Sequence, residues 1–581
     1  MAKIFINTLK PRNQSRCSRW SSHGFRTNSW FNDVIGCQTA EKLSTGSRNL
    51  FVSDEGDVVA SAGTLLTYDG EMGVDALKRI VENFKVEDPL AVRDQLFGHY
   101  LLFVWMKHKG FVFCDPIASY YCFYKIDNDN LEVSSLLSEF LSQEVPLLDP
   151  IRLTRAAFEG HAGYGGRTFV PEVNRLRGNE YLEVEADPFA GKAINVKFAR
   201  RTLSSNQSTG SLSAFNSAAE KIFKALSFVE SVGVNATGGL DSRLILAWSC
   251  NQKLSSQFIY GVGDSCMTNT RTEDLEIAKL LASHYRKPLS IMDWRGGLGS
   301  PKSRKQNFDR YGFAIPNRGV QGILKELDGE LDPYPYLHLG GYNPAFTNQK
   351  PWAYDAHNRT IESVAEISLK RLRGFICDEK AVSDSLMGDL KKLAATLGIS
   401  SNLGILEAED FVFLFYQAYQ PLESLALNSY NQVQHYLAPF FLSPIYEVLC
   451  KVPVEMRRED FFQVSAALEA DPSCFETPVY SGLKKVKIDP TKKVMSVIAG
   501  QDPRPMRRLA KFAPGRLKRV LKKSLLFRQS VGGSLDELIR SELATAISQQ
   551  LKSHQISIGE RRIDPRFMHD LALIFEVAGS R

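Results

Sequence analysis

Apolar and polar positions divide the chain into a first part with strand-like patterns and a second part in which strands and helices alternate. In the first part, residues 50–53 and 58–60 flank an acidic turn that contains a glycine, which predicts a hairpin. Two further apolar runs, 98–105 and 111–115, are joined by a short polar turn. Residues 1 to about 195 are therefore expected to be rich in β-structure.

The N-terminus allows two interpretations. Residues 1–32 contain no acidic residue but several basic residues and serines, a composition that transit peptides also have. Residues 3–7, however, alternate like a β-strand, and we see no convincing amphipathic helix in the segment. We expect a buried first strand followed by a basic loop.

A polar, serine-rich stretch at 201–210 predicts a linker between two domains. Beyond it, apolar residues at helical spacing between 215 and 226 predict a helix, and 257–261 read as a strand. Thr270 and Glu273 form a capping box that predicts the start of another helix. We divide the chain into the domains 1–197 and 212–490 and a C-terminal region, 491–581.

The most informative segment lies just after the predicted helix. An apolar strand at 232–236 leads into Thr237-Gly238-Gly239-Leu240-Asp241-Ser242, and an apolar helical run follows at once. Paired glycines let a backbone approach a phosphate closely, and the N–H groups and dipole of a helix N-terminus favour its charge. No Gly-Lys-Ser/Thr follows, so this is not the loop of the kinase-like NTPases. Asp241 is placed to hold a magnesium ion against a pyrophosphate.

This hexapeptide resembles the Ser-Gly-Gly-x-Asp-Ser loop of the ATP-pyrophosphatases, in particular of the asparagine synthetase B family. The resemblance implies ATP and Mg²⁺ as ligands, transfer of AMP to a carboxylate with release of pyrophosphate, and formation of an amide. It assigns pyrophosphate binding to the loop, with Asp241 as metal ligand and catalytic residue. The implied nucleotide-binding residues are Thr237, Gly238, Gly239, Leu240, Asp241, Ser242, Arg243, Gly261 and Gly340. The alternative is an ordinary glycine turn between any strand and any helix.

The first part of the chain resembles the glutamine amidotransferase domain that precedes the synthetase domain in the same family. The hairpin at 98–124 and the segment 169–182 match its patterns in order. In that family a cysteine directly after the initiator methionine is the glutaminase nucleophile, whereas this chain begins Met1-Ala2-Lys3. We therefore expect a domain without glutaminase activity, with the amine supplied by ammonia or by the acceptor itself.

Several positions depart from the family pattern. Its second acidic motif corresponds to the stretch 336–344, where the strand and the glycine turn remain but the acids do not. His338 is interpreted there as a hydrogen-bonded polar residue at a strand end. Arg243 stands where the family commonly has serine, and it either adds a contact to pyrophosphate or points to solvent. Asp274, like Asp264, flanks the nucleotide region and is either a ligand or a simple helix-start charge.

The family's lysine near the reacting phosphate has no clean counterpart. Lys484 and Lys485 are our candidates for that catalytic role, and a solvated basic loop is the alternative. Farther on, residues 504–528 carry ten basic residues and no acid, which is typical of a basic amphipathic helix. Such a helix fits an anionic membrane surface or an acidic partner. RNA is a weaker alternative for it.

Composition adds little to this picture. With 581 residues, 44% hydrophobic residues and a net charge of +6, the chain is ordinary for a globular protein of several domains. Nine scattered cysteines without a Cys-x-x-Cys indicate reduced thiols in the cytoplasm, with the inner membrane surface as a peripheral location.

The expected fold is an α+β amidotransferase-like domain (an Ntn-type β-sandwich), an α/β ATP-pyrophosphatase domain with a parallel sheet, and a basic helical tail. The expected activity is an asparagine synthetase-like, ATP-dependent amide-forming ligase acting on a small-molecule or peptide carboxylate. A catalytically inactive nucleotide-binding scaffold and an RNA-associated ATP-pyrophosphatase are the alternatives.

Overall fold

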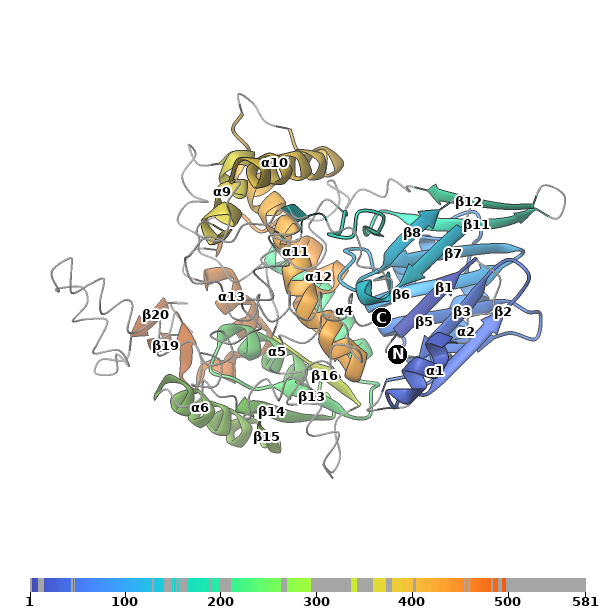
Figure 1. Ribbon diagram of the computed structural model, residues 1–581. Helices are drawn as coiled ribbons and strands as arrows, with labels where there is room; N and C mark the ends of the chain where they lie inside the picture. Colours follow the sequence, from blue (N-terminus) through green and yellow to red (C-terminus); the bar gives the residue numbers. More distant parts are fainter. Residues whose placement is uncertain are drawn as a thin grey trace, which may run out of the picture.

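A computed structural model represents the protein (Figure 1). It describes residues 3–497 with gaps, of which the longest are 9–14, 141–148, 156–165, 198–209, 263–268, 294–335, 342–358 and 373–378. Residues 498–581 lie outside the described part, and with them the predicted basic helix at 504–528. Among the described helices, none combines the length and the apolar character needed to cross a bilayer.

The first part of the chain is a sandwich of two six-stranded sheets. One sheet has the order β10-β8-β9-β1-β3-β2 and the other β12-β11-β7-β6-β5-β4, with antiparallel neighbours throughout. The strands are β1 (Lys3–Asn7), β2 (Thr27–Phe31), β3 (Gly36–Ala40), β4 (Leu50–Val52), β5 (Val58–Thr67), β6 (Leu96–Met106), β7 (Lys109–Cys114), β8 (Phe123–Asp127), β9 (Asn130–Ser134), β10 (Asn174–Arg175), β11 (Tyr181–Asp187) and β12 (Gly191–Lys197). The predicted β-rich character and the hairpin β4–β5 are confirmed.

Alternation of side chains along the strands forms the core of the sandwich. Ile4 and Ile6 of β1 face Ala60 of β5 and Phe103 of β6 in one buried cluster. The opposite face of the second sheet is covered by helix α2 (Gly73–Asn83), which buries Leu77 and its neighbours there. Short 3-10 helices η1 (Ala91–Gln95) and η2 (Leu137–Phe140) complete this half.

The prediction for the segment after β1 was wrong in part. The strand is buried as expected, but residues of the expected loop form helix α1 (Ser15–Ser22). Among the described side chains of this helix, Trp20 is the large one that is fully buried; its indole N–H donates to Glu139, and Arg19 pairs with the same carboxylate. Because one tryptophan and one ion pair hold this short helix, its sequence shows no extended apolar stripe from which a helix could be predicted.

The second half is built on a five-stranded sheet in which all neighbours are parallel, in the order β15-β14-β13-β16-β17. The strands are β13 (Val232–Asn235), β14 (Ser256–Val262), β15 (Leu289–Asp293), β16 (Leu337–Leu339) and β17 (His435–Leu437). The predicted parallel sheet is thus confirmed, and β13 lies at its centre.

Helices cover this sheet and extend beyond it. They are α4 (Leu212–Leu226), α5 (Leu240–Asn251), α6 (Asn269–Tyr285), α9 (Ile361–Leu372), α10 (Glu379–Thr396), α11 (Ala408–Val433), α12 (Ser443–Cys450) and α13 (Phe461–Ala470), with the 3-10 helices η7 (Pro439–Phe441) and η9 (Pro472–Phe475). Helix α6 already contains Thr270 at its second position, so the predicted capping box does not mark its start.

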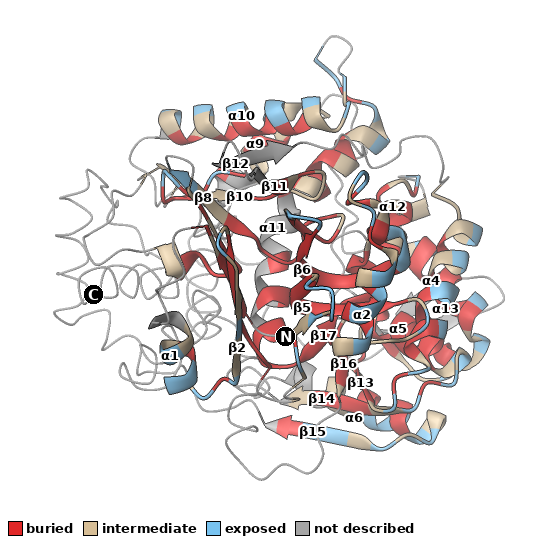
Figure 2. Cartoon of the chain, turned by 90° about the vertical axis from the view of Figure 1, so that its right-hand side faces the viewer, coloured by how far each residue is buried: buried red, intermediate tan, exposed pale blue. Residues whose placement is uncertain are grey.

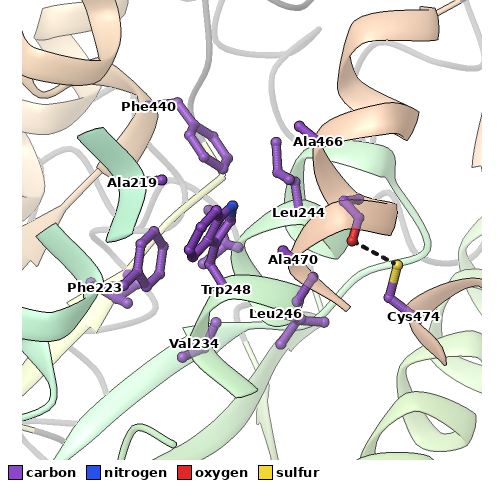
Figure 3. Packing of buried hydrophobic residues seen from close by; sticks show 14 of the residues in the cluster. Ala219, Phe223, Val234, Leu244, Leu246, Trp248, Phe440, Ala466, Ala470 and Cys474 are labelled. Carbon is purple, nitrogen blue, oxygen red and sulfur yellow. Dashed lines mark hydrogen bonds between the residues drawn. The ribbon is translucent and has the colours of Figure 1, made fainter. Parts of the chain in front are cut away.

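The main core of the second half joins α4, α5 and α13 to the central strand. Figure 3 shows Trp248 of α5 beside Phe223 of α4, with Val234 of β13 below. The two aromatic rings stack with their centroids 6.1 Å apart. This apolar packing fixes where α5 begins relative to the end of β13.

A small antiparallel sheet follows, of β18 (Val479–Ser481), β19 (Lys484–Asp489) and β20 (Val494–Val497). The proposed domain boundary at 490 therefore falls inside the hairpin β19–β20. The few described residues after 490 form a strand where a helical tail was predicted. Periodicity within four residues is too short a signal to detect such a strand.

Candidate functional site

The glycine loop lies where the sheet changes direction. From β13 the chain continues to β14 and β15 on one side, while β16 and β17 lie on the other side. In open parallel sheets this arrangement leaves a crevice at the carboxyl ends of the two central strands, where ligands bind. Residues 236–239 follow the carboxyl end of β13, and Gly340 and Gly341 follow that of β16. The fold thus brings the two glycine turns to one edge.

Short hydrogen bonds shape the loop. The hydroxyls of Thr237 and Ser242 lie 2.8 Å apart, and the Gly239 N–H donates to Thr237 Oγ1 over 3.3 Å. Helix α5 begins immediately afterwards, with Gly239 as its N-cap and without a side chain as cap. The predicted order of strand, glycine turn and helix is confirmed, and the helix presents an open N-terminus at the crevice.

Glycine leaves room on both turns. A Cβ atom placed on Gly239 would meet only Thr237 Oγ1, at 3.5 Å. A Cβ atom on Gly341 would lie 3.4 Å from Ser242 Oγ and 3.6 Å from Asp241 Cβ. The second turn therefore faces the start of α5 across a gap that a side chain would narrow. Sequence reasoning missed Gly341, although its position directly after Gly340 was a signal.

Asp241 lies in the first turn of α5 and is half-buried. Gln463 of α13 donates from Nε2 to Asp241 Oδ1 over 2.6 Å, which fixes the carboxylate. Within the described residues no group of three or more His, Cys, Asp or Glu side chains forms a metal cage. Magnesium is commonly held by one or two carboxylates together with substrate phosphates, so this donor set fits Mg²⁺ only together with a phosphate ligand.

Asp274 of α6 reaches the loop. Its Oδ1 accepts the N–H of Gly238 at 2.5 Å, and its Oδ2 accepts the hydroxyl of Tyr260 at 3.2 Å. The sequence left open whether Asp274 is a ligand or a helix-start charge. The structure shows that Asp274 contacts the loop backbone directly. This contact depends on how α6 packs beside the loop, which no local sequence pattern indicates.

Arg243 has neither of the two predicted environments. Its guanidinium is fully buried and donates to the backbone carbonyls of Cys474, Thr477 and Pro478. Burial lowers the pKa of Arg243 to about 10. The side chain thus ties the first turn of α5 to the segment 474–478, on the side away from solvent. The assignment of Arg243 to the nucleotide is therefore corrected. The carbonyls that it bonds lie more than 230 positions later in the chain, and no sequence pattern indicates such a contact.

Around β16, one of the two sequence-based interpretations is confirmed and the other is corrected. His338 is buried, and its pKa is lowered to about 3 by burial, so the ring is neutral. It bonds Asn235 Oδ1 at 2.7 Å, which confirms its interpretation as a hydrogen-bonded residue. Gly340 instead packs on Tyr436, since an added Cβ would lie 1.4 Å from that hydroxyl. Gly341 therefore replaces Gly340 as the residue that faces the loop.

The remaining predicted residues are only partly described. Gly261 lies in β14 close to its carboxyl end, on the edge of the sheet that carries the loop. Lys484 and Lys485 begin β19, and their side chains lie outside the described residues. Asp264 also lies outside them. The binding role of Gly261 and the catalytic role of the lysines remain predictions.

No family model matches the chain, and no curated protein matches it. Among solved structures, it is similar to glutamine phosphoribosylpyrophosphate amidotransferase from B. subtilis complexed with ADP and GMP, with 10% identity over 71% of this chain and 92% of that chain and a TM-score of 0.22. A structure described as the allosteric regulatory enzyme of purine biosynthesis gives 10% identity, 57% and 93% coverage and a TM-score of 0.21. Similarity at these TM-scores carries no conclusion about function.

Proposed function

We propose that this protein is an ATP-dependent, amide-forming ligase that transfers AMP to a carboxylate, releases pyrophosphate and joins the carboxylate to an amine. The observation that carries the proposal is the open N-terminus of α5, with Asp241 in its first turn, at the switch point of a parallel sheet. Helix N-termini at such points bind phosphates through N–H groups and the helix dipole.

The loop residues then have distinct roles. The backbone from Gly238 to Ser242 would bind the two outer phosphates, and the Thr237–Ser242 hydroxyl pair would fix the loop's curvature. Asp241, held by Gln463, would carry one ligand position of Mg²⁺. The metal ion, when bound, supplies charge that stabilises the departing pyrophosphate. The loop residues themselves bind and orient the nucleotide.

The substrate of this reaction differs from free aspartate. Gly341 faces Asp241, and the stretch 336–344 carries none of the acidic residues that the family resemblance would place there to assist amide formation from ammonia. We propose a carboxylate on a peptide, a polysaccharide or another metabolite, with the amine supplied by ammonia or by the acceptor.

ATP–pyrophosphate exchange tests the proposal directly. Purified protein with Mg·ATP, labelled pyrophosphate and a panel of candidate carboxylates is expected to incorporate label into ATP. Asp241→Asn keeps the size of the side chain and its bond to Gln463 but removes the charge. It is expected to lower exchange about 100-fold or more, because a metal ligand acts in the transition state. Uptake of Mg·ATP by wild-type protein is measured in parallel by calorimetry.

A second candidate is a nucleotide-binding scaffold without catalysis, favoured by the absence of acids next to Gly341. Under this function, Mg·ATP binds and Asp241→Asn weakens the binding, but no carboxylate supports exchange. If millimolar Mg·ATP does not bind to wild-type protein, both candidates are wrong.

A further inference from the structure

Lys42, just after β3 of the sandwich, is buried with 1% exposure. Its ammonium donates to the backbone carbonyl of Asn431, to the Asn431 side-chain oxygen at 3.3 Å and to the carbonyl of Gln434 at 2.6 Å. Helix α11 ends at Val433 with Gln434 as its C-cap. Lys42 thus binds the carbonyl end of a long helix of the other half, where unpaired acceptors and the helix dipole favour a cation.

Burying the Lys42 ammonium costs free energy unless hydrogen bonds replace its contacts with water. Burial shifts the pKa of Lys42 well below its usual value, and buried lysines are rare without a charged partner. Three acceptors in reach match the three donors of an ammonium group. The lysine therefore specifies one arrangement of the sandwich against the end of α11. Figure 2 shows β17, which follows this helix end, between β5 of the sandwich and β16 of the parallel sheet.

From Gln434 a first path leads to the glycine loop. The Gln434 side-chain amide lies 3.3 Å from His338 Nδ1, and His338 Nε2 lies 2.7 Å from Asn235 Oδ1. Asn235 is the last residue of β13, directly before the loop. Because His338 is neutral, one ring nitrogen donates and the other accepts, which suits a chain of amide groups.

A second path starts at the other partner of Lys42. The Asn431 side chain accepts the Thr64 hydroxyl of β5 and donates to the Tyr436 carbonyl at 2.9 Å. The Tyr436 ring occupies the space beside Gly340, and Gly341 next to it faces Asp241 and Ser242. The two paths therefore leave one lysine, run through different strands and end on the two glycine turns.

We propose that Lys42 is a positioning residue for the nucleotide loop: from the sandwich, it sets the α11–β17 junction and, through His338 and Tyr436, the two turns that face each other across the crevice. The proposal rests on the proposed function of that loop. It gives the sandwich a role in the reaction of the other half.

The test uses full-length protein and two buried lysines. Lys42→Met removes the ammonium and keeps the length of the side chain. Lys3→Met is the matched control, because Lys3 is equally buried near the contact of the sandwich with α11, but its nitrogen lies over the Phe25 ring, 4.3 Å from the centroid. Amide hydrogen exchange of residues 236–242 is measured without nucleotide, and the Kd for Mg·ATP by calorimetry.

Lys42→Met is expected to speed exchange in the loop and to weaken Mg·ATP binding about three- to thirtyfold, whereas Lys3→Met leaves both unchanged. Gln434→Leu, which breaks only the first path, serves if Lys42→Met does not fold, and is expected to change both readouts in the same direction. Loop exchange in Lys42→Met and Gln434→Leu equal to wild type would overturn the inference. If the wild type does not bind Mg·ATP, the proposed function fails, and the exchange measurement still decides the positioning role.

Discussion

Helices α4 and α5 flank the same central strand but begin in different ways. Helix α4 starts with Ser211, whose hydroxyl accepts the N–H of Ala214 over 3.1 Å in an ordinary N-cap. Helix α5 starts with Gly239, which has no side chain to offer, and Thr237 bonds Ser242 instead. The N-cap residue of α4 accepts a helix N–H with its side chain, whereas the N-cap residue of α5 makes no such bond.

The two N-cap residues differ little in how much they stabilise their helices but differ in the space that they leave for a ligand. A serine cap stabilises a helix by about 1 kcal/mol, and a glycine cap by only slightly less. What glycine adds is room for a ligand, because even an added Cβ on Gly239 would meet only Thr237 Oγ1, at 3.5 Å. The open start is supported from elsewhere: by Gln463 on Asp241 and by Arg243 on the segment 474–478. The predictions below test that division, from the largest expected effect to the smallest.

Arg243→Met is expected to give the largest loss of stability. The change leaves the carbonyls of Cys474, Thr477 and Pro478 without their buried donor, which costs about 3 kcal/mol in free energy of unfolding. The measurement is the midpoint of urea unfolding. Arg79→Met in α2 is the control, because Arg79 is exposed and its surface ion pairs contribute less than about 1 kcal/mol. Equal shifts for both variants would remove the structural role assigned to Arg243.

The two residues Asp241 and Arg243 show what sequence could and could not predict. The hexapeptide, its strand and its helix are local, so residue order alone predicted the loop and the start of α5. The direction of the Arg243 side chain depends on η9 and on Pro478 just before β18, which return to α5 after more than 200 residues. A guanidinium near a predicted phosphate site was therefore assigned to the wrong partner.

The same distinction holds for the rest of the molecule. The sandwich strands were predictable because alternation is local, and the turn at Lys107 and His108, both with positive φ, follows from a short polar stretch between apolar runs. Asp274 and Gly341 meet the loop only through tertiary approach, and Lys42 reaches α11 across 389 positions. No periodicity in the chain indicates such contacts.

Acid is expected to destabilise the folded protein through two buried histidines. His99 and His338 are fully buried, and burial lowers the pKa of each to about 3, whereas an unfolded histidine titrates near 6.5. Below that value the unfolded chain binds protons that the folded protein does not. The contribution of the two neutral histidines to the free energy of unfolding is therefore fully present above about pH 6.5. It decreases as the pH falls toward 3, by up to about 2 kcal/mol per histidine at pH 5.

Urea midpoints at pH 7, 6 and 5 measure this effect. His99→Gln is the comparison variant, because the amide can still bond Ser119 and the Ala438 N–H but does not titrate. Its stability is expected to depend less steeply on pH, by up to one proton between pH 6.5 and 5. Identical slopes in both proteins would show that folding does not lower the pKa of His99.

Asp274→Asn is expected to have the smallest effect on stability and a specific effect on the loop. In the wild type a carboxylate accepts the Gly238 N–H that would bind a phosphate oxygen, so the nucleotide must compete with it. An amide oxygen keeps the bond but is a weaker acceptor and removes one negative charge from the crevice. We expect pyrophosphate without metal to bind about three- to tenfold more tightly. Ser211→Ala, which opens α4 instead, is expected to lose about 1 kcal/mol of stability with unchanged pyrophosphate affinity. If pyrophosphate binds Asp274→Asn more weakly than wild type, the carboxylate supports the ligand, and the open start of α5 needs Asp274 as a partner in binding.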